Sequence, residues 1–370
     1  MNSYIILINN SKYLNDFKTY LKTNNIHLKF SSDTSLIFII ETTSKNINSM
    51  KSLNYIDIIT KDFRYSLPDP IYDFKRINDI NGTRSLDGTK NQSSSYKNWG
   101  VNSICAPCLW NKNITGSKVN VAILDSGISK HSDFTVKTSI SFVENETPED
   151  KDGHGTFVTG IIGGKNPNIN SFGVAYDCNL FNIKVLDNNG TGQLISLIEA
   201  IIWCGDNNIQ VANMSLGFNA GLDDLSITLL ESAINYSNSK GCIFVAASGN
   251  ESNDSLDYPA AINSVISVGA INSSYERENF SNYGPGLDYV APGSDIFSTY
   301  LNNSYALASG TSMSAPHVTG LIALLLSEDS SRTQEDIKSI LTKYSIDLGD
   351  TGYDLKYGNG LVNIPCFDKV

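Results

Sequence analysis

The segment GTSMSAPHVTG, residues 310–320, contains the side chain best suited to act as a nucleophile, Ser312. Ser312 lies between small residues and begins a run compatible with a helix, so we expect it at a helix N-terminus. Backbone N–H groups and the positive end of the helix dipole stabilise an anion formed there. A serine hydroxyl is a weak nucleophile at neutral pH, so the chain must also supply a general base and a carboxylate that orients it.

Two upstream segments offer these partners. Asp125 follows the apolar run VNVAIL, and His154 follows Asp152-Gly153 in DGHGTFVTG. Alone, an Asp at a strand end is more often a turn former or a helix cap, and a single His is usually structural. Of the other histidines, His27 lies in the N-terminal region, His131 in a polar turn and His317 behind Ser312, which leaves His154 as the best base.

Asn250, in AASGN after the run IFVAA, completes the set. Its side-chain NH2 can join the backbone N–H of Ser312 in holding the oxyanion of a tetrahedral intermediate. Each motif alone is weak. Asp, His, Asn and Ser in this order, each at the end of an element, predict covalent hydrolysis by an activated serine.

Apolar strands that alternate with helices must position these side chains. We expect strands at 119–124, 180–185, 211–214, 243–247 and 265–269, and helices at 154–163, 193–207, 225–239, 312–326 and 333–343. This alternation predicts an α/β fold of three layers, with a mainly parallel sheet covered by helices on both faces. Ligands of such sheets lie beyond the carboxyl ends of the strands, where Asp125 and Asn250 fall.

Residues 1–65 have a different pattern, with strands at 4–9, 27–31, 36–41 and 55–63 and helices at 11–24 and 44–53. The order β-α-β-β-α-β predicts a small ferredoxin-like α+β domain. Residues 66–95, rich in Pro, Gly, Asn and Ser, read as a linker open to cleavage. Residues 96–370 form the main domain.

Charge and composition limit the partners. Of the formal charge of −11, residues 1–76 carry +3 (10 Lys and Arg against 7 Asp and Glu) and the remainder −14 (17 against 31). An acidic main domain argues against nucleic acid. The early apolar run Tyr4 to Ile8 is too short for a secretion signal or a membrane span of about 20 residues. We expect a monomer without a membrane partner, cytoplasmic as written and secreted if a signal was trimmed.

The six cysteines are too sparse for a disulfide framework, so we expect buried free thiols. Cys105-Ala-Pro-Cys108 has the spacing of a redox motif. It lacks a preceding buried strand and a second cysteine pair for zinc, so we do not expect it to form a site.

The chain closely resembles the subtilisin family of serine proteases over residues 99–364. The resemblance rests on WGVNSICAPCLW, ITGSKVNVAILDSGI, DGHGTFVTG, FGVA, KVLDNNGTGQ, NMSLG, VAASGNE, NFSNYGPGLDYVAPG, GTSMSAPHVTG and YGNGLVNI. It implies a triad of Asp125, His154 and Ser312, with Asn250 in the oxyanion hole. Phe157 departs from the family, in which many members have a second His at this position. Residues 1–65 resemble the family's inhibitory, folding-assisting propeptide.

The resemblance also implies a substrate site for extended polypeptide. The expected lining residues are Ser215, Leu216, Gly217, Ala247, Gly249, Gly190 and Gly192. Asp257 falls at the base of the specificity pocket and Glu251 at its mouth. A carboxylate there favours cleavage after Arg or Lys. The alternative is that the short loop from Ser252 to Leu256 turns Asp257 toward solvent.

No cofactor is expected for catalysis, but the resemblance suggests a structural calcium ion. Asp133 matches a calcium ligand of the family, and Asn166 and Asn168 lie in a loop rich in oxygen donors. Pro167 falls where a side-chain ligand is expected.

Three further questions concern the role of the chain. Basic residues that could mark a maturation site are Arg64, Arg76, Arg84, Lys90 and Lys97. One alternative function is a catalytically silent module of the same fold that binds or regulates. A lipase or esterase is excluded because Ser314 replaces the second Gly of Gly-x-Ser-x-Gly and the order of the triad differs.

Overall fold

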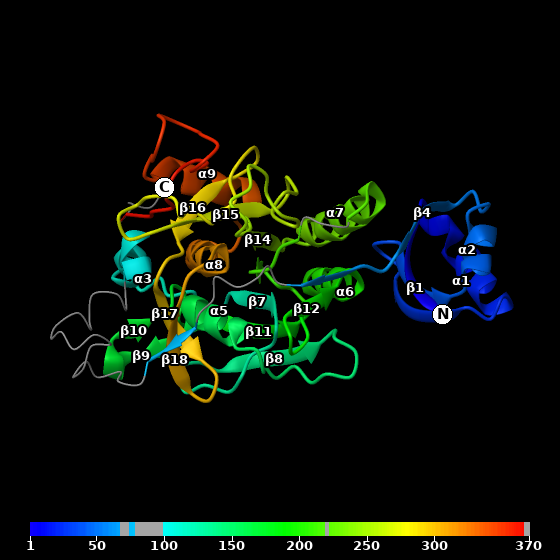
Figure 1. Ribbon diagram of the computed structural model, residues 1–370, viewed down its shortest axis with the longest axis horizontal. Helices are drawn as coiled ribbons and strands as arrows, with labels where there is room; N and C mark the ends of the chain where they lie inside the picture. The colour runs from blue at the N-terminus through cyan, green and yellow to red at the C-terminus, as the bar shows by residue number, and fades with distance from the viewer. Residues whose placement is uncertain (67–73, 78–98, 219–221, 366–370) are drawn as a thin grey trace.

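The computed structural model describes residues 1–66, 74–77, 99–218 and 222–365. Figure 1 shows a large α/β body with a small N-terminal unit at one end, beside α6 (Leu194–Asp206) and α7 (Asp224–Ser239). Most of the predicted linker lies outside the described residues. So do three of the five basic residues proposed as maturation sites, Arg84, Lys90 and Lys97.

The N-terminal unit has the predicted order of elements. Its elements are β1 (Asn2–Ile8), η1 (Ser11–Tyr13), α1 (Leu14–Thr23), β2 (His27–Ser32), β3 (Ile37–Thr42), α2 (Ser44–Met50) and β4 (Ile56–Lys61). The strands form an antiparallel sheet in the order β2-β3-β1-β4. Successive residues of a strand face opposite sides. Ile6 therefore packs under the helices with Phe17, whereas Ile5 and Ile39 pack in the apolar cluster that contains α6 and α7.

The body is built on a seven-stranded parallel sheet in the order β16-β15-β14-β13-β7-β11-β8. Its strands are β7 (Asn120–Asp125), β8 (Val136–Ser141), β11 (Asn179–Lys184), β13 (Val211–Met214), β14 (Ile243–Ala247), β15 (Ile266–Ile271) and β16 (Tyr289–Pro292). The five predicted strands are present, and β8 and β16 extend the sheet beyond them. The fold class predicted from the sequence is confirmed.

Helices cover both faces of this sheet. On one face lie α5 (His154–Gly163), α8 (Thr311–Glu328) and α9 (Gln334–Tyr344), and on the other α6 and α7. Short helices α3 (Trp99–Ser103) and α4 (Ala106–Trp110) precede β7. Small pieces complete the body: β9 (Lys165–Asn166), η2 (Pro167–Ile169), β10 (Ser171–Phe172), β12 (Thr191–Gln193) and the hairpin β17 (Ile296–Tyr300) with β18 (Ser304–Ala308). A capping box between Thr333 and Asp336 begins α9.

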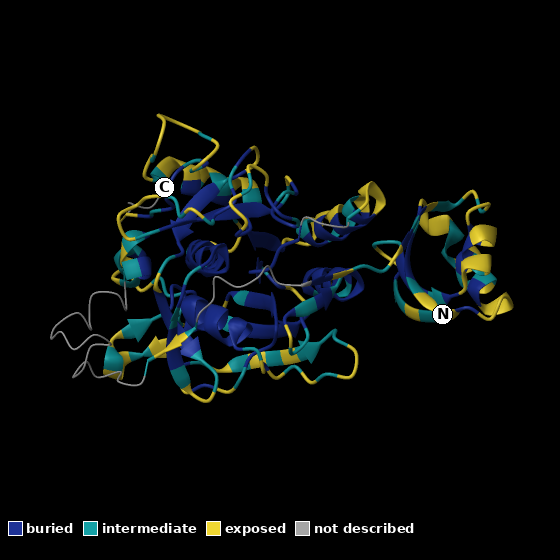
Figure 2. Cartoon of the chain, viewed as in Figure 1, coloured by how far each residue is buried: buried dark blue, intermediate teal, exposed yellow. Residues whose placement is uncertain are grey.

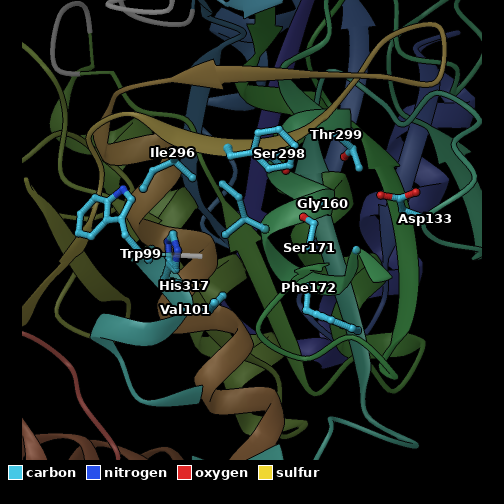
Figure 3. A pocket seen from close by; sticks show the side chains of 14 residues that line it. Trp99, Val101, Asp133, Gly160, Ser171, Phe172, Ile296, Ser298, Thr299 and His317 are labelled. Atoms are coloured by element: carbon cyan, nitrogen blue, oxygen red, sulfur yellow. The ribbon is translucent and has the colours of Figure 1, made fainter. Parts of the chain in front are cut away.

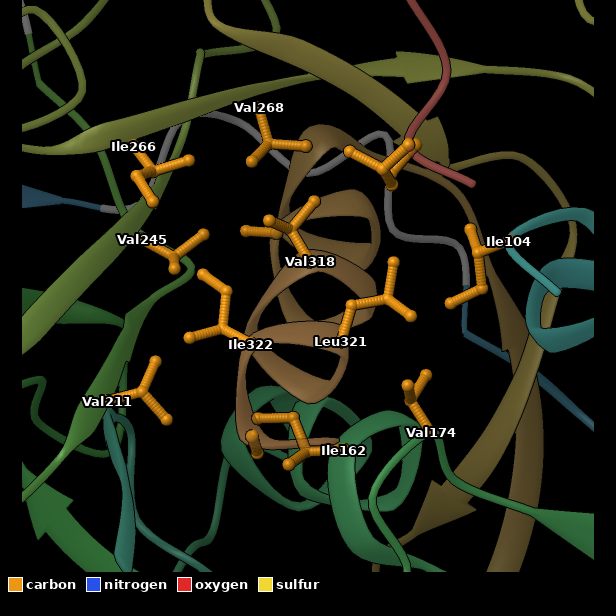
Figure 4. Close-up of a cluster of buried hydrophobic side chains, with 14 of the residues drawn as sticks. Ile104, Ile162, Val174, Val211, Val245, Ile266, Val268, Val318, Leu321 and Ile322 are labelled. Atoms are coloured by element: carbon orange, nitrogen blue, oxygen red, sulfur yellow. The ribbon is translucent and has the colours of Figure 1, made fainter. Parts of the chain in front are cut away.

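The helix that carries Ser312 runs through the core. Every residue from Thr311 to Leu326 is buried, and Figure 2 shows α8 in the buried colour. Figure 4 shows Val318, Leu321 and Ile322 among aliphatic side chains of the sheet and of neighbouring segments. Close packing of this kind fixes the position of the helix, and therefore of its first turn.

The expectation of free thiols was wrong for one pair. Cys105 and Cys108 form a disulfide, with Cα atoms 5.5 Å apart. Residues three apart at a helix start lie on the same side, within the usual range for a disulfide. Cys178, Cys204 and Cys242 are free, and Cys366 lies outside the described residues.

Candidate active site

A buried carboxylate–imidazole pair lies at the carboxyl edge of the sheet. Asp125 ends β7, His154 begins α5, and both side chains are almost fully buried. His154 Nδ1 lies 2.7 Å from Asp125 Oδ1. Gly155 permits this approach, because a Cβ there would lie 2.1 Å from the carbonyl oxygen of Gly127. The pair fixes the imidazole with Nε2 as the ring atom for proton transfer.

The environment of His154 favours its charged form. Burial lowers the pKa of an imidazole, but the charge of Asp125 and its hydrogen bond outweigh burial, with smaller effects from Asp152 and Asp150. The pKa of His154 is therefore raised above its ordinary value. An imidazolium that forms here during proton transfer is stabilised.

The other body histidines have structural partners. His317 Nδ1 lies 2.8 Å from the carbonyl oxygen of Met313, and burial lowers the pKa of His317 to about 4. His131 lies beside Asp133 and the carbonyl of Ser304. Among the described histidines, His154 is the one that pairs with a carboxylate at the sheet edge, as the sequence suggested.

Ser312 lies in the first turn of α8, next to the start of α5. Phe157 of α5 and Met313 of α8 belong to one buried cluster, so the two helix starts are neighbours. Ser312 Oγ donates to the carbonyl of Ser215 (3.1 Å), and Ser215 Oγ donates to the carbonyl of Ser312 (2.7 Å). These reciprocal bonds tie the loop after β13 to the serine.

Asn250 is oriented by the residue before Ser312. Its Oδ1 accepts hydrogen bonds from the backbone N–H and the hydroxyl of Thr311, both at 2.9 Å. Because its carbonyl end faces Thr311, the end of the amide that can donate to an oxyanion near Ser312 is the NH2 group.

Asp257 lies between two segments predicted to line the substrate site. It is only 2% exposed. A Cβ added to Gly217 would lie 3.0 Å from an Asp257 carboxylate oxygen, and one added to Gly249 would lie 2.7 Å from the same oxygen. The alternative that Asp257 turns to solvent is therefore wrong. The absence of side chains at Gly217 and Gly249 leaves room for this carboxylate.

Asn282, which the sequence analysis missed, holds the carboxylates of Asp257 and Glu251. Its Nδ2 donates to Glu251 Oε2 (2.7 Å) and Asp257 Oδ1 (3.3 Å). Its Oδ1 accepts the backbone N–H groups of Glu251 and Asn253. No local motif marks Asn282, because its role depends on contacts with residues about 30 positions away.

The N-terminal unit contributes a strand to the predicted substrate site. Arg64–Ser66, β5, pairs antiparallel with β12, with Tyr65 opposite Gly192. The Tyr65 ring is buried 4.4 Å from the Phe218 ring centroid, and a Cβ on Gly192 would clash with it. Of the remaining predicted lining residues, Leu216 and Ala247 are buried, and Gly190 ends the turn from Asp187 that leads to β12.

The residues expected to bind calcium do not form a set of oxygen ligands. The carboxylate of Asp133 accepts hydrogen bonds from the Tyr305 hydroxyl (2.7 and 2.9 Å) and Asn166 Nδ2 (3.0 Å). Asn166 Oδ1 accepts from the backbone of Asn168, whose side chain is exposed. Figure 3 shows Asp133 at one end of a pocket that polar and apolar side chains line together. Hydrogen-bond donors, not a cation, fit this arrangement.

The described ranges contain neither a cluster of metal ligands nor a membrane-spanning helix. Within residues 1–66, 74–77, 99–218 and 222–365, no group of three or more His, Cys, Asp or Glu side chains is arranged to hold a metal ion. Among the helices of those ranges, none has the length and apolar character needed to span a membrane.

Comparison with known proteins identifies the family. A model of the subtilase family matches residues 116–360. The chain is 41% identical over 266 residues to Subtilisin Savinase of Lederbergia lenta, which covers 72% of this chain and 96% of that protein. M-protease of Shouchella clausii is also 41% identical, over 72% of this chain and 68% of its own. The Minor extracellular protease Epr of Bacillus subtilis is 37% identical, over 75% of this chain and 42% of its own.

The family match covers the strand and helix ends where the buried Asp–His pair and the serine lie, and the relatives extend it over most of the body. The chain belongs to the subtilase family and is a subtilisin-like serine endopeptidase.

Proposed function

We propose that Asp125, His154 and Ser312 act as the catalytic triad of this peptidase, with Asn250 as an oxyanion donor. The observation that carries the proposal is the 2.7 Å contact between His154 Nδ1 and Asp125 Oδ1. This contact lies at the start of α5, next to the helix that begins with Thr311 and Ser312.

The reaction follows from the roles of these groups. Ser312 Oγ attacks the substrate carbonyl while His154 Nε2 takes its proton, and Asp125 stabilises the resulting imidazolium. The Asn250 NH2 and the Ser312 backbone N–H stabilise the oxyanion. His154 then gives the proton to the leaving amine, and water, deprotonated by the same imidazole, cleaves the acyl-enzyme.

For specificity, we propose cleavage after Arg or Lys. The proposal is supported by the position of Asp257 between Gly217 and Gly249, and by Asn282, which holds its carboxylate. A carboxylate in a closed pocket pairs with a guanidinium or ammonium group and leaves an apolar side chain poorly placed. Steady-state kinetics with substrates that differ only in the residue before the cleaved bond test this directly.

For regulation, we propose that residues 1–65 act as an inhibitory propeptide. Supporting observations are the pairing of β5 with β12 and the burial of Tyr65 against Phe218, because Gly192 of β12 is one of the residues expected to line the substrate site. The excess positive charge of residues 1–76 against the acidic remainder favours docking. If the Ser312→Ala chain remains intact while the wild-type chain shortens itself, the result would support an autocatalytic zymogen. We include in the same proposal a role of the enzyme in processing precursor proteins.

The alternative is a silent module that binds peptides without cutting them. It predicts that a fluorophosphonate probe leaves Ser312 unlabelled even after the N-terminal unit is displaced. The buried Asp125–His154 contact gives no support to this alternative, because a silent module has no need of it.

A further inference from the structure

A second length of the N-terminal chain pairs with the body. Lys75–Arg76, β6, lies antiparallel to β18 at the edge of a three-stranded sheet in the order β17-β18-β6. The next residue, Ile77, donates its N–H to the carbonyl of Tyr305 in β18 (3.1 Å). Main-chain hydrogen bonds of this kind bind extended polypeptide with little dependence on its sequence.

The direction of this segment relates it to the catalytic serine. β18 ends at Ala308, four residues before Ser312. Because β6 is antiparallel to β18, the segment is nearest Ser312 at Phe74 and runs away from it toward Ile77. Earlier in the chain, β5 lies on β12, at the rim of the specificity pocket. Along the chain, β5 therefore comes first, on the acyl side of the proposed site, and the segment on β18 follows it. A bound substrate has the same order, with its acyl side before its leaving-group side.

The residue nearest Ser312, Phe74, lies in a cluster of aromatic rings. The ring centroid of Phe74 lies 4.7 Å from that of Tyr300 and 5.4 Å from that of Phe157. Phe157 comes three residues after His154, and Met313, which follows Ser312, belongs to the same cluster. Aromatic rings at these separations attract one another beyond simple burial. The cluster therefore includes residues from the first turns of α5 and α8, the two helix starts that carry His154 and Ser312.

The hairpin that presents β18 is fixed to α5. The Ser298 hydroxyl donates to the carbonyl of Phe157 (2.6 Å), and the Thr299 hydroxyl donates to the carbonyl of Thr156 (2.8 Å). Figure 3 shows Ser298 and Thr299 lying close to Gly160 of α5, where a Cβ would collide with both hydroxyls. The edge of β18 thus has a defined position relative to His154, as a binding surface beside a reacting bond requires.

Charge at the same edge favours a basic segment. The Arg76 guanidinium lies over the Tyr300 ring, 5.5 Å from its centroid. Lys75 and Arg76 are exposed, and the chain beyond residue 76 carries a formal charge of −14. A cation over an aromatic face is attracted by the ring quadrupole.

We propose that the edge of β18 (Ser304–Ala308), with the rings of Phe157 and Tyr300, is a docking site for the leaving-group side of extended polypeptides. It takes an aromatic residue followed by basic residues, and the segment Phe74–Ile77 of this chain is its resident occupant. The assignment of this site to the leaving-group side depends on the proposed triad. The binding of an extended segment at β18 does not depend on it.

A competition experiment tests the site with added peptide. The enzyme is the Phe74→Ala chain after its N-terminal unit has been displaced, because residues 1–65 are the proposed inhibitor. The substitution weakens the chain's own segment. Two substrates share the same residues before the cleaved bond: an anilide with no peptide beyond it, and an internally quenched peptide that extends well beyond it. The competitor is a capped Gly-Gly-Phe-Lys-Arg-Ile-Gly-Gly peptide, and its Phe→Ala analogue is the control.

We expect the competitor to raise KM about tenfold for the extended substrate, to leave kcat/KM for the anilide unchanged, and to lose its effect in the analogue. Equal inhibition of both substrates would mean that the peptide binds on the acyl side and would overturn the proposal. Inhibition of neither substrate would also overturn the proposal. If the enzyme cuts neither substrate, the proposed catalytic function fails, and the second experiment still tests the docking site.

Hydrogen exchange tests the resident segment without catalysis. In the full Ser312→Ala chain, Phe74→Ala should speed amide exchange in residues 304–308 about tenfold, because the pairing of β6 with β18 opens more often. Tyr13→Ala, a half-buried aromatic of the N-terminal unit that stacks on Tyr55, is the matched control and should leave this exchange unchanged. Unchanged exchange in Phe74→Ala, or equal effects of both variants, would overturn the proposal.

Discussion

Substitution of Asp257 by Ser is the sharpest test of the proposed specificity. The Asp257 carboxylate is 2% exposed, so a bound Arg or Lys would meet it largely out of water. Loss of one partner of a buried, hydrogen-bonded charge pair costs about 2–5 kcal/mol, or roughly 30- to 5000-fold in kcat/KM. Since Asn282 already satisfies part of this carboxylate, we expect the lower part of the range, about 10²-fold.

The assay compares kcat/KM for four anilides that end in Arg, Lys, Leu or Phe. Asp257→Ser should lower the values for Arg and Lys by about 10²-fold and leave those for Leu and Phe within about threefold. Glu251→Gln is the matched control: Glu251 shares Asn282 with Asp257 but is exposed, and an exposed charge contributes about 1 kcal/mol or less. A wild-type preference for Leu or Phe, or an unchanged ratio of Arg to Leu in Asp257→Ser, would refute the reasoning.

Three further predictions concern the catalytic groups and the docking of the N-terminal unit. Asn250→Ala should lower kcat about 10²- to 10³-fold with little change in KM, the loss observed for an oxyanion donor in a subtilisin; a change confined to KM would contradict this role. Asp125→Asn should lower kcat about 10⁴-fold, as in a subtilisin, and move the acidic limb of the pH–rate profile to lower pH, because Asp125 raises the pKa of His154. Burial raises the pKa of Glu199 to about 7 beside Asp62 of the N-terminal unit, with Lys29 opposing the shift. Docking should therefore be strongest well below pH 7 and weaken as pH rises through 7. Glu199→Gln should remove this dependence, measured as amide exchange at the pairing of β5 with β12 in the Ser312→Ala chain.

Much of the fold follows from local patterns. The apolar strands β7, β11, β13 and β14 and the helix α5 lie within a residue or two of their predicted positions, because each is a short run with one dominant periodicity. The proposed catalytic side chains also have a local signal, since each directly follows or begins such a run. A reacting side chain must lie at the end of a strand or helix to reach a substrate beyond the sheet edge, and the sequence shows where strands and helices end.

The rest depends on contacts between distant segments. The pairing of β6 with β18 joins residues about 230 positions apart, and two residues of extended chain carry no periodicity. Asn282 resembles any other polar loop residue until Asp257 and Glu251 are brought to it. Asp133 matched a calcium ligand, but the hydroxyl of Tyr305, 172 residues away, donates to its carboxylate. None of these pairings has a local signal.

The measurement closest to the central claim is the site and rate of modification by a fluorophosphonate, mapped by tandem mass spectrometry after the N-terminal unit is displaced. If Ser312 is the nucleophile and His154 its base, the wild-type chain should carry a single adduct on Ser312. The rate should fall by about 10³-fold or more in His154→Ala, because the serine then lacks its base. An adduct on another serine, or an equal rate in His154→Ala, would contradict these roles.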